Sequence, residues 1–101
     1  INSNLGVFVN DLGGAGSGPI AFTQGTPSSG LTYTFTSLSS LTDDVDFSNN
    51  GGATWTYVPT AGANGCDNNV TNIRINPKGT FASGLTGADP NFQIRFRSCV
   101  K

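Results

Sequence analysis

The stretch NFQIRFRSCV, residues 91–100, alternates apolar and polar side chains along most of its length. One face carries Phe92, Ile94 and Phe96, continued by Ser98 and Val100, and the other carries Gln93, Arg95 and Arg97, continued by Cys99. Successive side chains of an extended strand point to opposite sides of a sheet, so this period of two is typical of a half-buried strand. We therefore predict a strand over residues 91–100 with its apolar face inward.

The same period recurs along the chain, whereas no segment keeps an apolar period of 3.6 residues. Residues 31–36, LTYTFT, alternate apolar residues with threonines, and residues 69–76 alternate with a shift that suggests a bulge near Asn72. Shorter candidate strands are LGVFV (5–9), PIAFT (19–23), VDFS (45–48), TWTYV (54–58) and GTFAS (79–83). These patterns predict an all-β protein.

Clusters of Gly, Pro, Asn and Asp separate the predicted strands. About eight short strands with turns at this spacing favour an antiparallel β-sandwich or barrel. The turn at residues 49–52, NNGG, can supply the positive φ angles of a tight hairpin between VDFS and ATWTYV. With 101 residues and no internal linker or repeat, we expect a single domain over residues 1–101.

The composition argues against several functions. The chain has no His, and all six of its acidic residues are Asp, so common general bases and metal ligands are missing and we expect no enzyme. Five basic residues without a cluster, and a net charge of -1, make nucleic acid an unsuitable partner. No apolar run approaches the roughly 18 residues of a membrane span, so we expect none.

The chain has two cysteines, Cys66 and Cys99, and no His to complete a zinc site with them. We predict that they form one disulfide, which indicates an oxidising compartment and an extracellular or cell-surface location. The alternative is a pair of buried free thiols that behave as small hydrophobic side chains.

The acidic residues Asp43, Asp44 and Asp46 form the one carboxylate cluster in the sequence. A solvated loop at the entrance of a strand is the simpler interpretation. The alternative is a weak calcium site, with Asp67 or Asp11 as a further ligand, because Ca²⁺ prefers oxygen ligands from alternate loop positions. We expect no other cofactor.

Two further surface features have simple and functional interpretations. Asn69 begins the pattern NVT, a weak signal for N-glycosylation because the pattern is short and often accidental. Arg95 and Arg97, together with Lys101, are candidates for binding an anionic polymer. Such residues more often cover the solvent face or the edge of a strand.

Residues Ser48, Asn50, Gly52, Thr54 and Trp55 resemble the Asp-box of sialidase-type β-propellers, with Asn50 where that motif usually has Asp. The motif occurs once, in a chain too short for even four propeller blades. Sialidase chemistry also uses a Glu, which the chain lacks. We therefore interpret the motif as a structural hairpin in which Asn50 steadies the turn and Trp55 packs.

Three stretches together carry a wider resemblance: DDVDFSNNGGATWTYVP (43–59), VTNIRINPKGTF (70–81) and PNFQIRFRSCVK (90–101). They resemble the C-terminal part of the conserved-repeat surface domain, domain of unknown function 11, of bacterial and archaeal envelope proteins. The resemblance implies an immunoglobulin-like β-sandwich in an exported structural protein without catalysis. The usual opening pair of strands is missing before Ile1, and Cys66 and Cys99 are additions to the pattern.

A sandwich without its opening strands would expose an apolar groove and unpaired edges, which invite a strand from another copy. We therefore expect a homopolymer, a cell-surface filament assembled by strand exchange. The alternatives are a fragment of a longer multidomain protein and a complete compact sandwich whose first strand is LGVFV (5–9). The expected donor is the N-terminal segment with Leu5, Val7, Phe8 and Val9, and the C-terminal segment is the second choice. The alternative function is a carbohydrate-binding or adhesive module that presents Trp55 and Tyr57 to surface glycans.

Overall fold

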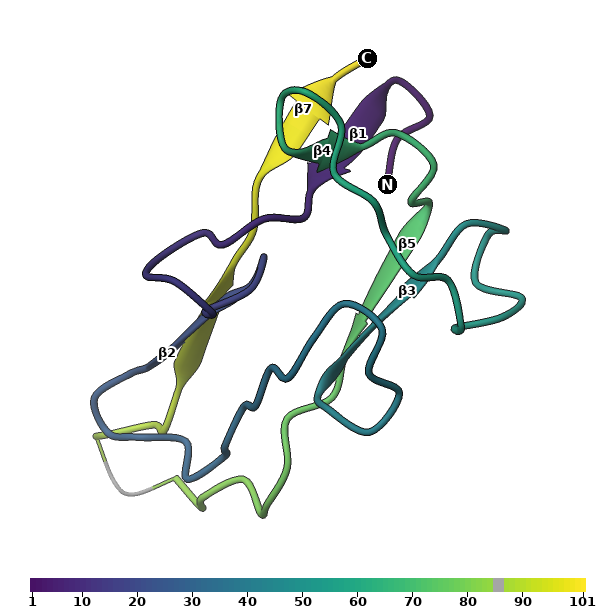
Figure 1. Ribbon diagram of the computed structural model, residues 1–101. Coiled ribbons are helices and arrows are strands. Elements are labelled where there is room, and N and C mark those ends of the chain that lie inside the picture. Colours follow the sequence, from purple (N-terminus) through teal and green to yellow (C-terminus); the bar gives the residue numbers. More distant parts are fainter. Residues whose placement is uncertain (85–86) are drawn as a thin grey trace.

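The computed structural model describes residues 1–84 and 87–101, and these residues contain no helix. The strands are β1 (Leu5–Phe8), β2 (Ala21–Gln24), β3 (Val45–Ser48), β4 (Cys66–Asp67), β5 (Asn72–Ile75), β6 (Phe92–Arg95) and β7 (Ser98–Val100) (Figure 1). They form three small sheets with the orders β4-β1-β7, β2-β6 and β3-β5, and all four pairings are antiparallel. The predicted all-β, antiparallel architecture is confirmed.

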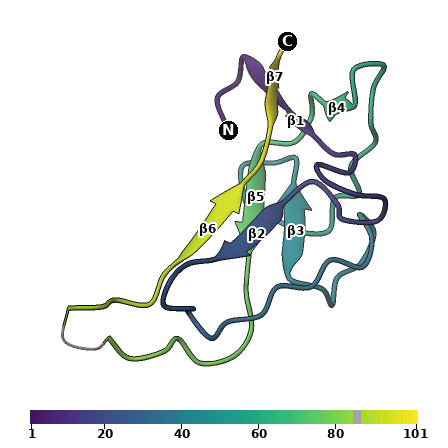
Figure 2. The same ribbon diagram turned by 90° about the vertical axis from the view of Figure 1, so that its left-hand side faces the viewer.

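Strand β1 is the middle strand of its sheet. Its residue Val7 lies opposite Asp67 of β4 on one side and opposite Ser98 of β7 on the other. Only Phe96 and Arg97 separate β6 from β7, and Figure 2 shows β6 leading on into β7. The N–H of Phe8 donates to the carbonyl of Arg97 at 2.9 Å, so the C-terminal segment joins the β4-β1-β7 sheet to the β2-β6 pair.

The hydrophobic core combines residues from different sheets. In the β3-β5 pair, Val45 lies opposite Ile75 and Phe47 lies opposite Ile73, and Figures 1 and 2 both show these strands side by side. The buried core cluster consists of Val7, Val9, Ile20, Val45, Phe47 and Val70. Because Val7 belongs to β1 and Phe47 belongs to β3, the core packs one sheet against another.

Residues 31–36 do not form the predicted strand, although their side chains alternate between a partly buried and an exposed face as predicted. Its apolar residues are partly buried and its threonines are exposed, yet an isolated bridge at Thr32 is the one ladder contact described there. The N–H of Thr34 donates to Oδ2 of Asp44 at 2.8 Å, and the N–H of Thr36 donates to Oδ2 of Asp43 at 3.0 Å. Two carboxylates therefore bind the amides that a neighbouring strand would have bound.

The predicted hairpin between residues 45–48 and 53–58 is also wrong. Gly51 and Gly52 do adopt positive φ angles of 76° and 88°. Strand β3, however, pairs with β5, and residues 54–58 and 79–83 form no strand. The turn chemistry was readable from the sequence, but the partner of β3 lies further along the chain.

The predicted strand over residues 91–100 divides into β6 and β7. Its alternation holds as far as Ile94 and then fails, because Phe96 is 46% exposed and Val100 is 80% exposed. Val100 lies in β7, at the outer edge of its three-stranded sheet, whereas Phe96 lies in the two-residue link between β6 and β7 and belongs to no strand. Cys99, expected on the outward face, is partly buried because it is bonded to Cys66.

Candidate functional site

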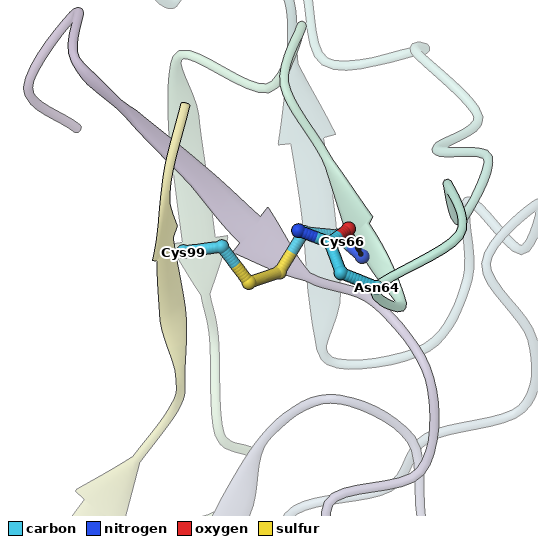
Figure 3. Close-up of a disulfide and its surroundings, with 3 residues drawn as sticks. All are labelled: Asn64, Cys66 and Cys99. Atoms are coloured by element: carbon cyan, nitrogen blue, oxygen red, sulfur yellow. Dashed lines mark hydrogen bonds between the residues drawn. A yellow bond between two sulfur atoms is a disulfide. The ribbon is translucent and has the colours of Figure 1, made fainter.

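Strand β1 lies in a slot between β4 and β7, and a disulfide joins these two walls of the slot. Cys66 of β4 and Cys99 of β7 form a disulfide with their Cα atoms 6.4 Å apart, which confirms the predicted pairing. Cys66 lies opposite Phe8 and Cys99 lies opposite Gly6. Directly opposite residues of antiparallel strands share a face, so the bridge crosses β1 on the face away from Val7 (Figure 3).

Position 6, where the bridge crosses β1, has little room for a side chain. A Cβ atom on Gly6 would collide with the side-chain oxygen of Asn68 and would lie 3.1 Å from the carbonyl oxygen of Asp67. The absence of a side chain therefore lets the chain after β4 approach β1 closely. The wall at β4 is further fixed by the N–H of Cys66, which donates to Oδ1 of Asn64 at 3.1 Å (Figure 3).

The residues predicted to act as a donor strand occupy this slot within their own chain. Val7 and Val9 are buried in the core, and Leu5 is partly buried. Phe8 points to the other face, where the guanidinium of Arg97 lies 4.9 Å from the centre of its ring. At this position the expected apolar groove is therefore filled by β1 itself.

The acidic cluster of Asp43, Asp44 and Asp46 binds backbone N–H groups and two cationic side chains. Asp44 and Asp43 accept the backbone N–H groups of residues 34 and 36. In addition, Oδ1 of Asp44 lies 2.6 Å from Nζ of Lys78, and Oδ2 of Asp46 lies 2.9 Å from Nη2 of Arg74. Residues 1–84 and 87–101 contain no group of three His, Cys, Asp or Glu side chains that could hold a metal ion. The weak calcium site at Asp43, Asp44 and Asp46 stays a prediction without such a group to support it.

The other two predicted calcium ligands also bind donors of the chain. Asp67 accepts the hydroxyl of Tyr57 at 2.7 Å and the N–H of Thr60 at 2.8 Å. Burial and this hydrogen bond to Asp67 raise the pKa of Tyr57. Asp11 accepts the N–H groups of Gly16 and Gly18, each at 2.8 Å, and these two bonds lower the pKa of its carboxyl.

The Asp-box-like stretch forms a loop that is braced by its own side chains. The hydroxyl of Ser48 accepts the N–H groups of Asn50 at 3.2 Å and Gly52 at 2.9 Å and donates to the Asn50 side chain at 2.7 Å. The Asn50 side chain also bonds Thr54, donating to its hydroxyl and accepting its N–H. The guanidinium of Arg74 lies 4.7 Å from the ring centre of Trp55, so the indole is partly covered.

The glycosylation pattern lies on the surface. Asn69 is exposed just after β4, while the Thr71 hydroxyl accepts the N–H of Gly51 at 2.9 Å and donates to the carbonyl of Ser48 at 3.2 Å. These contacts do not test whether Asn69 is glycosylated, so its glycosylation stays a prediction.

Two hollows open on the surface. One, of about 380 Å³, lies between β2 and residues 33–35 and is lined by aromatic side chains that include Phe22 and Tyr33. The other, of about 530 Å³, lies where β6 meets β7 and is lined by Leu12, Arg95, Phe96, Arg97 and Ser98. The sequence indicated Arg95 and Arg97 of the second hollow as candidates for binding an anionic polymer, but no pattern in it indicated the hollow itself.

Comparison with known proteins adds no relative. No family model matches the chain, and no curated protein and no solved structure matches it significantly. Within the described residues, no helix of the length and apolarity needed to cross a membrane occurs.

Proposed function

We propose that this chain is a structural module of an extracellular or cell-surface protein, and that copies of it assemble into a filament by exchanging β1. One observation carries the proposal: β1 contributes the fully buried Val7 to the core and lies between two strands that the Cys66–Cys99 disulfide ties together. A strand of the same sequence from another copy would fit this slot equally well.

The use of the polar side chains supports a structural role. Asp43 and Asp44 bind backbone amides, Ser48 and Asn50 close a loop, and both cysteines are joined. Polar side chains of types that bind ligands or catalyse reactions in other proteins are used here for hydrogen bonds and a disulfide within the chain. The disulfide also suits an oxidising compartment, which agrees with an exported protein.

The arrangement of the sheets supports an immunoglobulin-like sandwich as the finer description of the fold. Strand β1, joined to the β2-β6 pair through the C-terminal segment, contributes Val7 and Val9 to the core, and β3 contributes Val45 and Phe47. Two layers of antiparallel strands around one core are the basis of a β-sandwich. The proposed kinship with the conserved-repeat surface domain rests on this arrangement and on the sequence resemblance.

Exchange of β1 preserves the contacts of the slot because the incoming strand has the same sequence. A domain swap therefore costs little contact energy, and its extent depends on protein concentration and on the hinge. The disulfide keeps the two walls of the slot near each other while the strand is absent. If each copy donates to the next, the contact is head-to-tail and propagates into a filament.

The connection after β1 is long enough for exchange. Residues 10–18, which contain four glycines, would span about 30 Å when extended. The two shorter dimensions of the molecule are 26 Å and 24 Å, so this segment could reach a neighbouring copy. Opening it would break the hydrogen bonds that Asp11 makes to Gly16 and Gly18.

The alternative sugar-binding function through Trp55 and Tyr57 has less support. An aromatic side chain that binds sugar needs an accessible ring face, and Arg74 lies over the Trp55 ring. Tyr57 packs against the core and its hydroxyl donates to Asp67. Both aromatic side chains are therefore partly covered, which gives this function less support.

The hinge provides the test. Inserting Ser-Gly-Ser-Gly after Gly14 lengthens the segment that returns β1 to its own slot, and a longer hinge disfavours domain swapping. We expect the insertion variant to form smaller assemblies than the wild type at equal concentration, measured by light scattering and negative-stain electron microscopy. A control replaces residues 13–16 with Ser-Gly-Ser-Gly at unchanged length and should behave as the wild type. A wild-type protein that stays monomeric at every concentration, or a folded insertion variant that assembles as much as the wild type, would contradict the proposal.

A further inference from the structure

The positive charges that lack an acidic partner gather in one segment. Arg74 and Lys78 form ion pairs with Asp46 and Asp44. The other three of the five basic residues are Arg95, Arg97 and Lys101, all within the last seven residues. In the ranges 1–84 and 87–101 none of these three forms an ion pair, and all three residues are exposed along the C-terminal segment.

Two of these charges border the hollow of about 530 Å³ where β6 meets β7. Arg97 is held there by its position 4.9 Å from the ring centre of Phe8, on the outer face of β1. Between the arginines Phe96 is 46% exposed, an uncommon position for a large aromatic side chain. The hollow is thus lined by two arginines and by an exposed phenylalanine.

The opposite wall of the hollow is fixed by backbone hydrogen bonds. Leu12, which lines it, donates its N–H to the carbonyl of Gly18 at 2.9 Å. The carboxylate of the neighbouring Asp11 accepts the N–H groups of Gly16 and Gly18. Because both of its oxygens bind the loop in this way, its negative charge is partly balanced by amide dipoles rather than left to repel an anion.

We propose that this hollow binds an acidic polysaccharide that carries carboxylate groups, with Arg95 and Arg97 holding the carboxylates and Phe96 packing on a sugar ring. Planar guanidinium groups pair with carboxylates through two parallel hydrogen bonds. Aromatic rings pack on the apolar C–H faces of pyranoses, which explains why an exposed Phe lies between two arginines. The volume of the hollow lies in the range of small-ligand sites.

The charge of the whole chain favours this ligand over nucleic acid. A nucleic-acid site needs many cations to neutralise closely spaced phosphates. This segment offers three cations in a protein whose net charge is -1. A uronate polymer carries fewer charges per unit length, so two arginines suffice for a local contact.

The test measures binding of oligogalacturonate to the monomeric fraction by isothermal titration calorimetry, with neutral dextran as the control ligand. Arg95→Gln and Arg97→Gln should each weaken binding about tenfold, because each removes a charge-assisted pair. Phe96→Ala should weaken it as well. Lys101→Gln is the matched control: it removes the same charge outside the hollow and should change affinity much less.

Three results would overturn the proposal. One is an absence of binding to oligogalacturonate by folded wild-type protein at low ionic strength. Another is an equal loss for Lys101→Gln and Arg95→Gln, which would indicate only general charge attraction. The third is tighter binding of single-stranded DNA or anionic vesicles than of oligogalacturonate. Because the assay uses monomer, its outcome is independent of strand exchange.

Discussion

Removing the disulfide should destabilise this domain by a large part of its total stability. The bridge joins residues 33 positions apart. In the chain-entropy model a loop of that size reduces the entropy of the unfolded chain by about 12.5 cal/mol/K, or about 3.7 kcal/mol at 25 °C. A small domain has a free energy of unfolding of about 5–15 kcal/mol, so the loss is substantial.

The assay is urea unfolding followed by the fluorescence of Trp55, the single tryptophan of the chain. With a slope of about 1.5 kcal/mol per molar urea, the midpoint should fall by about 2.5 M in Cys66→Ala/Cys99→Ala. Cys66 is 3% exposed, so its truncation also removes packing. The matched control is therefore wild-type protein with a reducing agent, which keeps both side chains.

A small loss of stability on reduction would contradict this prediction. If the reduced protein unfolds within about 1 kcal/mol of the oxidised protein, the loop closed by the bridge does not constrain the unfolded chain as the model requires. The walls of the β1 slot would then need another source of stability.

Three further predictions concern ionisable side chains. Asp44→Ala should lower the free energy of unfolding in urea by about 1–3 kcal/mol, because it leaves the backbone N–H of Thr34 without its acceptor. Lys78→Met should lower it by less than about 1 kcal/mol, because the ammonium group is largely solvated. The pKa of Asp11 lies below its ordinary 3.8, so the contribution of this carboxylate to stability should be complete above pH 3.8 and be lost as the pH falls through the lower folded pKa. NMR titration of the Asp11 carboxyl in folded protein measures this pKa, and a value at or above 3.8 would contradict the prediction. Tyr33 and Tyr57 both have raised pKa values, mainly because of burial, so their contribution to stability should be complete below pH 10.0 and be lost as the pH rises through the higher folded values. Ultraviolet titration should show both phenolates forming above pH 10.0, and two tyrosines that titrate near pH 10.0 in folded protein would refute this.

Local patterns predicted much of the strand content. Residues 45–48 and 92–95 alternate clearly and form β3 and β6. The two-residue strand β4 carries no alternation and could not be found from its sequence. Residues 31–36 alternate as a strand should, but whether a segment joins a ladder depends on which acceptor reaches its amides. Here Asp43 and Asp44 supply the acceptors, and no sequence period reveals that.

The candidate site was predictable in its parts and not in its arrangement. Two cysteines without His were enough to predict the disulfide. The position of β1 between β4 and β7 is a non-local pairing that brings residue 6 opposite residue 99. The same holds for the hollow at β6 and β7: the sequence contains its arginines, but only the fold brings Leu12 against them.

The most direct test of strand exchange uses the register of β1 with β7. Leu5 lies opposite Val100, so Leu5→Cys/Val100→Cys should form a new disulfide wherever β1 occupies a slot, since Cβ atoms of such pairs lie about 4.5–5.5 Å apart. After oxidation of a concentrated, assembled sample, we expect a ladder of covalently linked copies on a non-reducing gel, and Leu5→Cys alone should give none. A single monomer band that carries the new disulfide within one chain would contradict strand exchange, because β1 would then never leave its own slot.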